Sequence, residues 1–185
     1  MAMSAFLDQK LTRRFRSFDV NGNGFVERKD FEAATERMAK AFGHRSDTPA
    51  YQKLQELTAR LWEGLAAFAD TDGDGRISES EYKVAFTEKI LAHPGAFDQA
   101  YKPWLDTIME IVDADGDGRL NSAEYLRWAS SMLGVHADHA EDAFRRLDRD
   151  EDGFINRDEL VESIRDYYFS EDPDSTGNWL LGPLK

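Results

Sequence analysis

Apolar residues recur every three or four positions in eight stretches of this chain, separated by polar or glycine-rich segments. That spacing places apolar side chains along one face of a helix, so we expect eight helices. Their limits carry familiar signals: Ser4 is a suitable first N-cap, Gly43 follows the second helix, and Thr48-Pro49 suits the start of the third. The pattern predicts an all-α protein with a compact interior.

The run His93-Pro94-Gly95 interrupts the middle of the chain. A continuous helix cannot pass through it, so the two halves need not be held apart, and we expect them to share one core. Pro103 is expected to start or kink the helix that follows. We divide the chain into an N-terminal unit (1–93), a C-terminal unit (94–169) and a tail packed on the core (170–185).

Four of the loops between helices repeat one spacing of oxygen-bearing side chains around a glycine. The residues at positions 1, 3, 5 and 12 are Asp19, Asn21, Asn23 and Asp30; Asp70, Asp72, Asp74 and Glu81; Asp113, Asp115, Asp117 and Glu124; and Asp148, Asp150, Asp152 and Glu159. This is the EF-hand calcium loop, in which position 7 adds a backbone carbonyl and the position-6 glycine makes the sharp turn. The position-7 residues are Phe25, Arg76, Arg119 and Phe154. The sequence therefore predicts four EF-hands that bind three to four calcium ions.

The residue at position 8 of each loop is apolar and a good strand former. We expect these residues to join the loops in two pairs through short two-stranded links, Val26 with Ile77 and Leu120 with Ile155.

Loop one departs from the other three, because Asn21 and Asn23 replace carboxylates and Asp30 stands in the place of glutamate. Aspartate is one methylene shorter, so two-oxygen contact with the ion would require the exiting helix to move inward. A single oxygen from Asp30 would suit the octahedral shell of magnesium, and Glu27 could reach the ion in compensation. We expect site one to be weaker for calcium or mixed calcium/magnesium; the alternative is an empty site.

The chain has 185 residues, a formal charge of −13 and no cysteine. This charge argues against nucleic acid as a partner, and the absence of cysteine excludes disulfides and thiolate metal sites. No apolar run is long enough to span a membrane, and the N-terminus does not resemble a signal peptide. We expect a cytoplasmic monomer without enzymatic activity and with no protein partner that the sequence identifies, since no nucleophile or phosphate-binding motif is present.

The four loops, their unequal spacing and the segment 172–183 resemble the sarcoplasmic calcium-binding protein family, in particular its bacterial, calerythrin-like branch. The resemblance implies a compact four-EF-hand fold, calcium ligands at the loop positions given above, and a role as a calcium buffer. In that family one loop, often the second, is commonly degenerate, whereas loop two is intact here.

Two other functions are open. A calcium sensor opens a methionine-rich groove for partner helices, but this chain has five methionines against 12 Phe, 6 Tyr and 4 Trp. A coelenterazine-type ligand carrier also sets four hands around an aromatic cavity. Because the last helix carries Tyr167 and Tyr168 without a histidine, we interpret the aromatic residues as core.

The last residues turn from polar to apolar at Trp179, Leu180, Leu181 and Leu184. Leaving these side chains in water is unfavourable, so we expect the tail to fill an apolar groove and block partner binding. The alternative is a frayed terminus.

Overall fold

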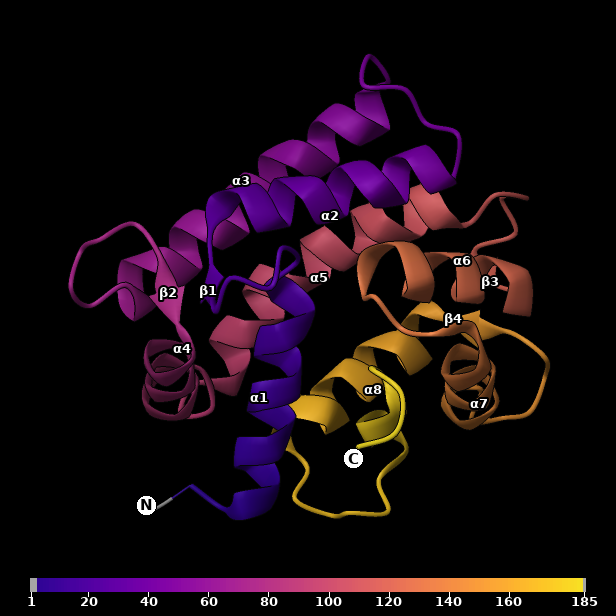
Figure 1. Cartoon of the computed structure of the whole chain (residues 1–185). Helices are drawn as coiled ribbons and strands as arrows, with labels where there is room; N and C mark the ends of the chain where they lie inside the picture. The colour runs from indigo at the N-terminus through magenta and orange to yellow at the C-terminus, as the bar shows by residue number, and fades with distance from the viewer. Residues whose placement is uncertain (1–2, 185) are drawn as a thin grey trace.

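A computed structural model describes residues 3–184, apart from the side chains at positions 90, 94, 96 and 100. Its first half contains two helix–loop–helix units (Figure 1). Helices α1 (Ala5–Phe18) and α2 (Arg28–Ala41) flank loop one, and α3 (Pro49–Ala69) and α4 (Glu79–Ala85) flank loop two. A π-helical turn, Phe86–Ile90, follows α4 directly.

The second half repeats this arrangement. Helices α5 (Pro94–Val112) and α6 (Ser122–Met132) flank loop three, α7 (Ala137–Leu147) and α8 (Arg157–Phe169) flank loop four, and the tail contains a 3₁₀ turn, Thr176–Trp179. The predicted break in the middle of the chain is confirmed. Of the two alternatives for Pro103, the start of a helix is wrong, because α5 begins at Pro94 and Pro103 lies in its interior. That Pro103 kinks the helix stays a prediction.

The predicted helix starts are confirmed by their hydrogen bonds. The Ser4 hydroxyl accepts from the Leu7 amide at 3.2 Å, and the Thr48 hydroxyl accepts from the Tyr51 amide at 3.4 Å. Each satisfies a backbone donor that the first turn of a helix leaves without an internal partner.

Two short antiparallel ladders join the loops in the predicted pairs. Strand β1 (Phe25–Val26) pairs with β2 (Ile77–Ser78), and β3 (Arg119–Leu120) pairs with β4 (Ile155–Asn156). Val26 lies opposite Ile77 and Leu120 lies opposite Ile155, and all four side chains are fully buried. The all-α fold of four paired hands is therefore confirmed.

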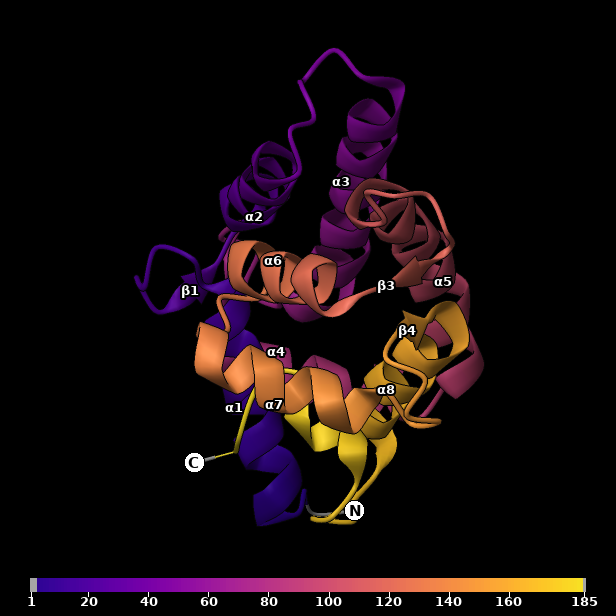
Figure 2. The ribbon, with the colours of Figure 1, turned by 90° about the vertical axis from the view of Figure 1, so that its right-hand side faces the viewer.

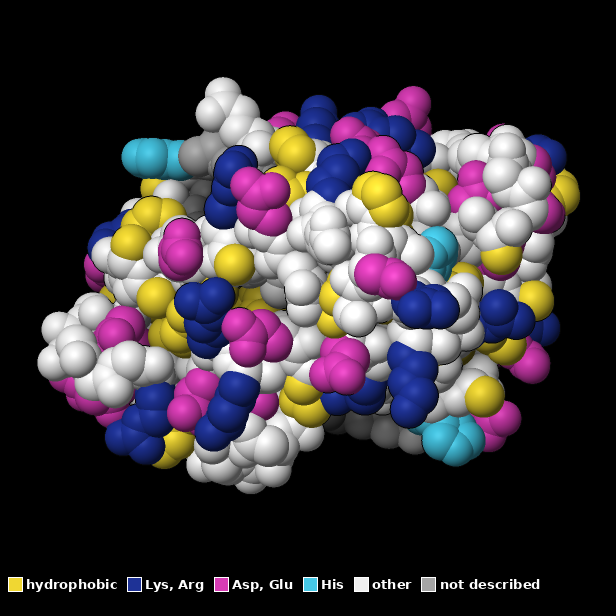
Figure 3. Space-filling view, turned by 90° about the horizontal axis from the view of Figure 1, so that it is seen from above, with side chains coloured by type: hydrophobic (Ala, Val, Ile, Leu, Met, Phe, Trp, Pro, Cys, Tyr) yellow, Lys and Arg dark blue, Asp and Glu magenta, His cyan; other side chains and the backbone are white. Residues whose placement is uncertain are grey.

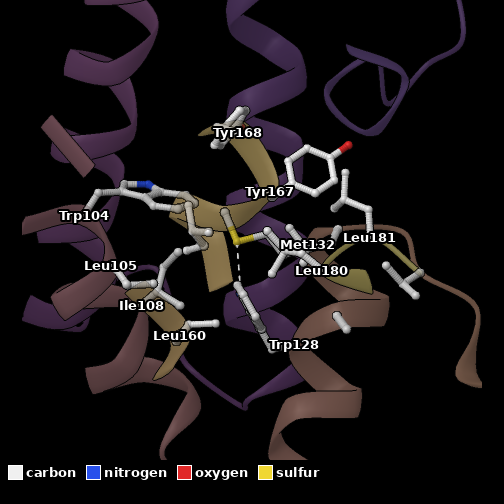
Figure 4. Close-up of a cluster of buried hydrophobic side chains, with 14 of the residues drawn as sticks. Trp104, Leu105, Ile108, Trp128, Met132, Leu160, Tyr167, Tyr168, Leu180 and Leu181 are labelled. Atoms are coloured by element: carbon white, nitrogen blue, oxygen red, sulfur yellow. Dashed lines mark hydrogen bonds between the residues drawn. The ribbon is translucent and has the colours of Figure 1, made fainter. Parts of the chain in front are cut away.

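The two pairs of hands pack against each other (Figures 1 and 2). Helix α2 contacts α3 of its own half and α6 of the other, while α1 contacts both α4 and α8. The Arg37 guanidinium on α2 donates to the Ser131 carbonyl on α6 at 3.1 Å. One contiguous hydrophobic cluster runs through both halves, and Figure 4 shows the part around Trp104 and Trp128, where the Trp128 indole nitrogen lies 3.4 Å from the Met132 sulfur.

The tail contacts α7 and α8 (Figure 1). Leu180 and Leu181 are 4% and 2% exposed, and both lie in the close-up of the core in Figure 4. From α1, the Arg13 guanidinium donates to the carbonyls of Leu181 and Pro183, the latter at 2.7 Å. The end of the chain is thus tied to its beginning.

No helix among residues 3–184 is long and apolar enough to cross a membrane. On the face shown in Figure 3, acidic and basic side chains are interspersed, with small apolar areas between them.

Candidate metal centres

Three of the four loops bring three carboxylates together. In each, one oxygen from every member lies within 4.8 Å of the others, and the groups are Asp70, Asp72 and Glu81; Asp113, Asp115 and Glu124; and Asp148, Asp150 and Glu159. These are the residues predicted at positions 1, 3 and 12 of loops two, three and four.

Backbone amides inside each loop hold the first carboxylate in place. In loop two, Asp70 accepts from the amides of Gly73 at 2.8 Å and Gly75 at 3.0 Å. Gly75, at position 6, has φ +80°, in the left-handed region where a residue with a side chain is strained. The turn therefore needs glycine there, as the loop pattern requires.

Loop four contains an exception that the sequence pattern did not reveal. Position 4 also takes a left-handed conformation, and loops one to three have glycine there, but loop four has Glu151 with φ +58°. A non-glycine residue in this region costs on the order of 1–2 kcal/mol, so loop four folds against local strain.

The position-12 glutamate reaches back across its loop. In loop two, Glu81 accepts from the Ser78 amide at 2.9 Å with one oxygen and from the Thr71 amide at 3.0 Å with the other. The amide and hydroxyl of Ser78, together with Thr71, lower the pKa of Glu81 to about 2, so it stays ionised. Glu124 and Glu159 make the same pair of amide contacts in loops three and four.

This donor set fits calcium. Carboxylate and carbonyl oxygens are the ligands of a hard divalent cation, and a glutamate at position 12 can supply two oxygens to a shell of six to eight. The position-5 carboxylates complete the side-chain set, and in each of loops two, three and four they accept from the position-7 amide: Asp74 from Arg76, Asp117 from Arg119, and Asp152 from Phe154.

Loop one is built differently at its last position. Asp30 is 2% exposed and accepts from the Glu27 amide at 2.9 Å. Its second oxygen accepts from the Asn21 side-chain nitrogen at 2.7 Å, whereas the glutamates of the other loops reach the amide at position 2. The shorter side chain is thus held by another residue of the ligand set. Asn23, at position 5, accepts from the Phe25 amide at 2.9 Å, as in the other loops.

The Glu27 carboxylate lies beside the ligand positions of loop one, but it already has two partners. Its carboxylate accepts from the Asn23 side-chain nitrogen at 2.9 Å and pairs with Lys29 at 2.7 Å. These hydrogen bonds from Lys29 and Asn23 lower the pKa of Glu27.

A cation lies over an aromatic ring between the loops of each pair, a relationship that we did not predict. The Arg76 guanidinium lies 4.3 Å from the Phe25 ring centre, and that of Arg119 lies 3.8 Å from the Phe154 ring centre. All four are position-7 residues, predicted only as carbonyl donors. Arg119 also lies 3.3 Å from the carboxylates of Asp117 and Asp152, so a positive charge borders both sites of the second pair. An arginine and a phenylalanine at matching positions of paired loops were the signal available in the sequence.

Family models match this chain at all four loops. An EF-hand domain pair matches residues 8–87, an EF hand matches residues 105–127, and an EF-hand domain matches residues 139–169.

Curated relatives match over most of their length. Calerythrin from Saccharopolyspora erythraea is 30% identical over 90% of this chain and 94% of its own. The sarcoplasmic calcium-binding protein beta chain from Penaeus sp. is 29% identical over 91% of each chain. A luciferin-binding protein from Renilla reniformis is 27% identical over 95% of this chain and 93% of its own.

A solved structure of a calcium-binding protein from Streptomyces coelicolor has the same fold. It superposes with a TM-score of 0.77 at 30% identity, covering 96% of this chain and 99% of that one.

Proposed function

The chain belongs to the EF-hand family of calerythrin and the sarcoplasmic calcium-binding proteins, and from this premise we propose that this calcium-binding protein is a cytoplasmic calcium buffer. The ligands are the side chains at positions 1, 3, 5 and 12 of each loop with the position-7 carbonyl. Loops two to four hold calcium, and loop one holds calcium or magnesium. Four divalent ions would bring the formal charge from −13 to −5 by adding +8, so metal binding also relieves repulsion among the loops.

The observation that carries the buffer role is the closure of the apolar faces. A sensor must expose such a face when calcium binds. Here α2 packs on α6 and α1 packs on α8, so opening either pair of hands would disrupt its contact with the other. The described methionines of the core, Met38, Met109 and Met132, are 0–9% exposed.

The division into two hand pairs and a packed tail supports the same role. The tail covers α7 and α8 through buried Leu180 and Leu181. A surface covered in this way is not offered to a partner helix. We propose that the protein acts as a monomer without enzymatic activity.

A calcium sensor is the alternative that the Streptomyces coelicolor protein supports, since that protein is described in terms of calcium-mediated regulation. A ligand carrier is the alternative that the Renilla luciferin-binding protein supports. A sensor would expose apolar surface on binding calcium, and a carrier would bind an organic molecule with an affinity that changes when calcium binds.

Calorimetric titration of the intact chain with calcium, with and without magnesium, tests the proposal. We expect three to four calcium ions, the weakest of which magnesium displaces. Glu81→Gln, Glu124→Gln and Glu159→Gln should each remove one high-affinity ion, because each takes away one of the two oxygens given by position 12. Glu63→Gln, at an exposed position on α3 outside the loops, is the matched control. An unchanged ion count in all three variants would refute the assigned ligands.

A further inference from the structure

A cavity of about 440 Å³ lies between the first pair of hands and the first half of α5, and none of its lining residues is an assigned calcium ligand. Its wall comes from α1, α2, α3, α4, the π-helical turn and the first half of α5, which can be followed in Figure 1. The lining surface is mainly apolar and aromatic, with Phe18, Phe31, Phe86, Phe97 and Trp104 among its members. Its polar members besides the tyrosines are Arg60, Glu88, Lys89 and His93. This volume lies within the range of sites for drug-sized molecules.

Gly64 leaves open space at the wall of the cavity. It lies in the interior of α3 and lines the cavity, and a Cβ built on it would meet no atom within 4 Å. Glycine inside a helix is about 0.8–1.0 kcal/mol less favourable than alanine. Neither a turn nor a left-handed conformation requires glycine at this position, so its effect on the structure is the space that it leaves.

Tyr82 places a polar group without a partner in this wall. The side chain is fully buried and lines the cavity, and its hydroxyl has no hydrogen-bond partner among residues 3–184. A buried hydroxyl left without a partner costs on the order of 1–3 kcal/mol, which a ligand that accepts or donates a hydrogen bond there would recover.

Behind the wall lies a buried cation. Arg14 is 4% exposed, and its guanidinium donates to the hydroxyls of Tyr168 at 2.7 Å and Tyr101 at 3.3 Å. The remaining contacts are Ser17 and the ring of Phe18, so no carboxylate of the described chain pairs with Arg14. Buried charges are normally paired, and here the nearest groups are neutral.

Tyr101 links that cation to the cavity. It lines the cavity, its oxygen accepts from Arg14, and it shares a hydrogen bond of 3.3 Å with the Tyr168 hydroxyl. A negative group in the cavity beside Tyr82 and Tyr101 would therefore lie in the field of an uncompensated guanidinium.

We propose that this cavity binds a small aromatic molecule that carries one anionic oxygen group. The ring system lies among the phenylalanine and tryptophan side chains, and the anionic group faces Tyr82 and Tyr101 with Arg14 behind them. Its lining residues Phe18, Phe31 and Tyr82 adjoin loops one and two in the chain without being assigned ligands, and the proposal does not depend on the buffer role.

Two probes with one aromatic frame test the proposal on the intact, calcium-loaded chain. 8-Anilinonaphthalene-1-sulfonate carries an anion, and N-phenyl-1-naphthylamine lacks it. We expect one sulfonate probe per chain, bound about tenfold or more tighter than the neutral probe, as hydrogen bonds to a charged group allow. Equal affinities for the two probes would overturn the proposal.

Gly64→Phe fills the cavity and should lower the affinity for both probes at least about tenfold. Gly64→Ala is its control and should keep both affinities within about twofold of those of the parent chain. If Gly64→Phe bound both probes with the same affinity as the parent chain, the proposal would be overturned.

Tyr82→Phe removes only the hydroxyl without a partner, so folding should be unaffected. It should lower the affinity for the sulfonate probe about fivefold or more and leave the affinity for the neutral probe unchanged. Tyr125→Phe is its control. The Tyr125 hydroxyl is also buried and has no partner among the described residues, but the Tyr125 ring packs on Trp128 and Phe144 of the second pair. If Tyr82→Phe and Tyr125→Phe bind the sulfonate probe equally, the proposal is wrong.

Discussion

Asn21 donates a hydrogen bond of 2.7 Å from its side-chain nitrogen to Asp30, joining positions 3 and 12 of loop one. The other loops have a carboxylate at position 3, which cannot donate such a bond, and a glutamate at position 12 that reaches the position-2 amide instead. The difference in composition between loop one and the others thus becomes a difference in how the position-12 carboxylate is held.

Lengthening this ligand should strengthen calcium binding at site one. Asp30→Glu can supply two oxygens, so we expect calcium affinity to rise roughly tenfold and competition by magnesium, which prefers octahedral geometry, to fall. Calorimetry with and without magnesium measures both effects. Asp30→Asn is the control and should lower the affinity of site one for both metals. If Asp30→Glu raised the affinity for magnesium as much as that for calcium, this account would be contradicted.

Removing the cation between loops three and four should tighten their calcium binding. The Arg119 guanidinium borders Asp117 and Asp152 and repels an incoming divalent ion. Because Arg119 is partly exposed, solvent and salt screen this effect, and we expect Arg119→Met to raise affinity about two- to fivefold at low salt and less at high salt. Arg127→Met, on α6 beside Phe42, should change neither site. A gain independent of salt would exclude this electrostatic cause.

Much of this site follows from local sequence, because an EF-hand loop is a short segment whose ligands are fixed by spacing. The position-8 pairings, such as Val26 with Ile77, were predictable for the same reason. The start of α5 at Pro94, nine residues before Pro103, was not decided by the sequence. The cost of Pro103 to the helix is local, while the gain from burying Phe97 and Trp104 on α5 is tertiary. The cavity was also hidden, because aromatic residues at helical spacing look the same whether they fill a core or line a space.

The tail docks against α8 at Gly177, where no side chain fits. A Cβ there would lie 2.5 Å from the Ser163 carbonyl oxygen and 2.8 Å from the Tyr167 nitrogen. Gly177→Ala should therefore detach the tail and lower the free energy of unfolding by about 1–3 kcal/mol. Denaturant unfolding measures the loss, and limited proteolysis with mass spectrometry should find new cleavage after residue 170. Gly64→Ala is the control, with open space around its Cβ; equal stability and equal protection in both variants would refute tail docking at this glycine.

Lys10 makes stability depend on pH at the contact between α1 and α8. Its ammonium group is buried and donates to the carbonyls of Ser170 at 2.7 Å and Asp166 at 3.3 Å. Burial lowers the pKa of Lys10 from 10.5 to about 8, against the attraction of Asp166 and Glu171. Above pH 8 the unfolded chain binds the proton that the folded chain releases, so stability should rise with pH up to about 10.5.

Lys10→Met lacks this titration and serves as the reference. Urea unfolding of both calcium-loaded proteins at pH 7, 8 and 9 should show the original chain gaining stability relative to the variant above pH 8. A constant difference across this range would show that Lys10 keeps its ordinary pKa in the fold.

Retention on a phenyl-substituted matrix, compared between the calcium-loaded and magnesium-loaded chain, tests the central claim that calcium is held in a closed fold. A buffer whose two hand pairs stay packed should elute in calcium no later than in magnesium. The Gly64→Phe variant, with its cavity filled, should behave in the same way. Retention of both proteins in calcium alone, with release by a chelator, would mean that calcium opens an apolar face, and it would contradict the buffer role.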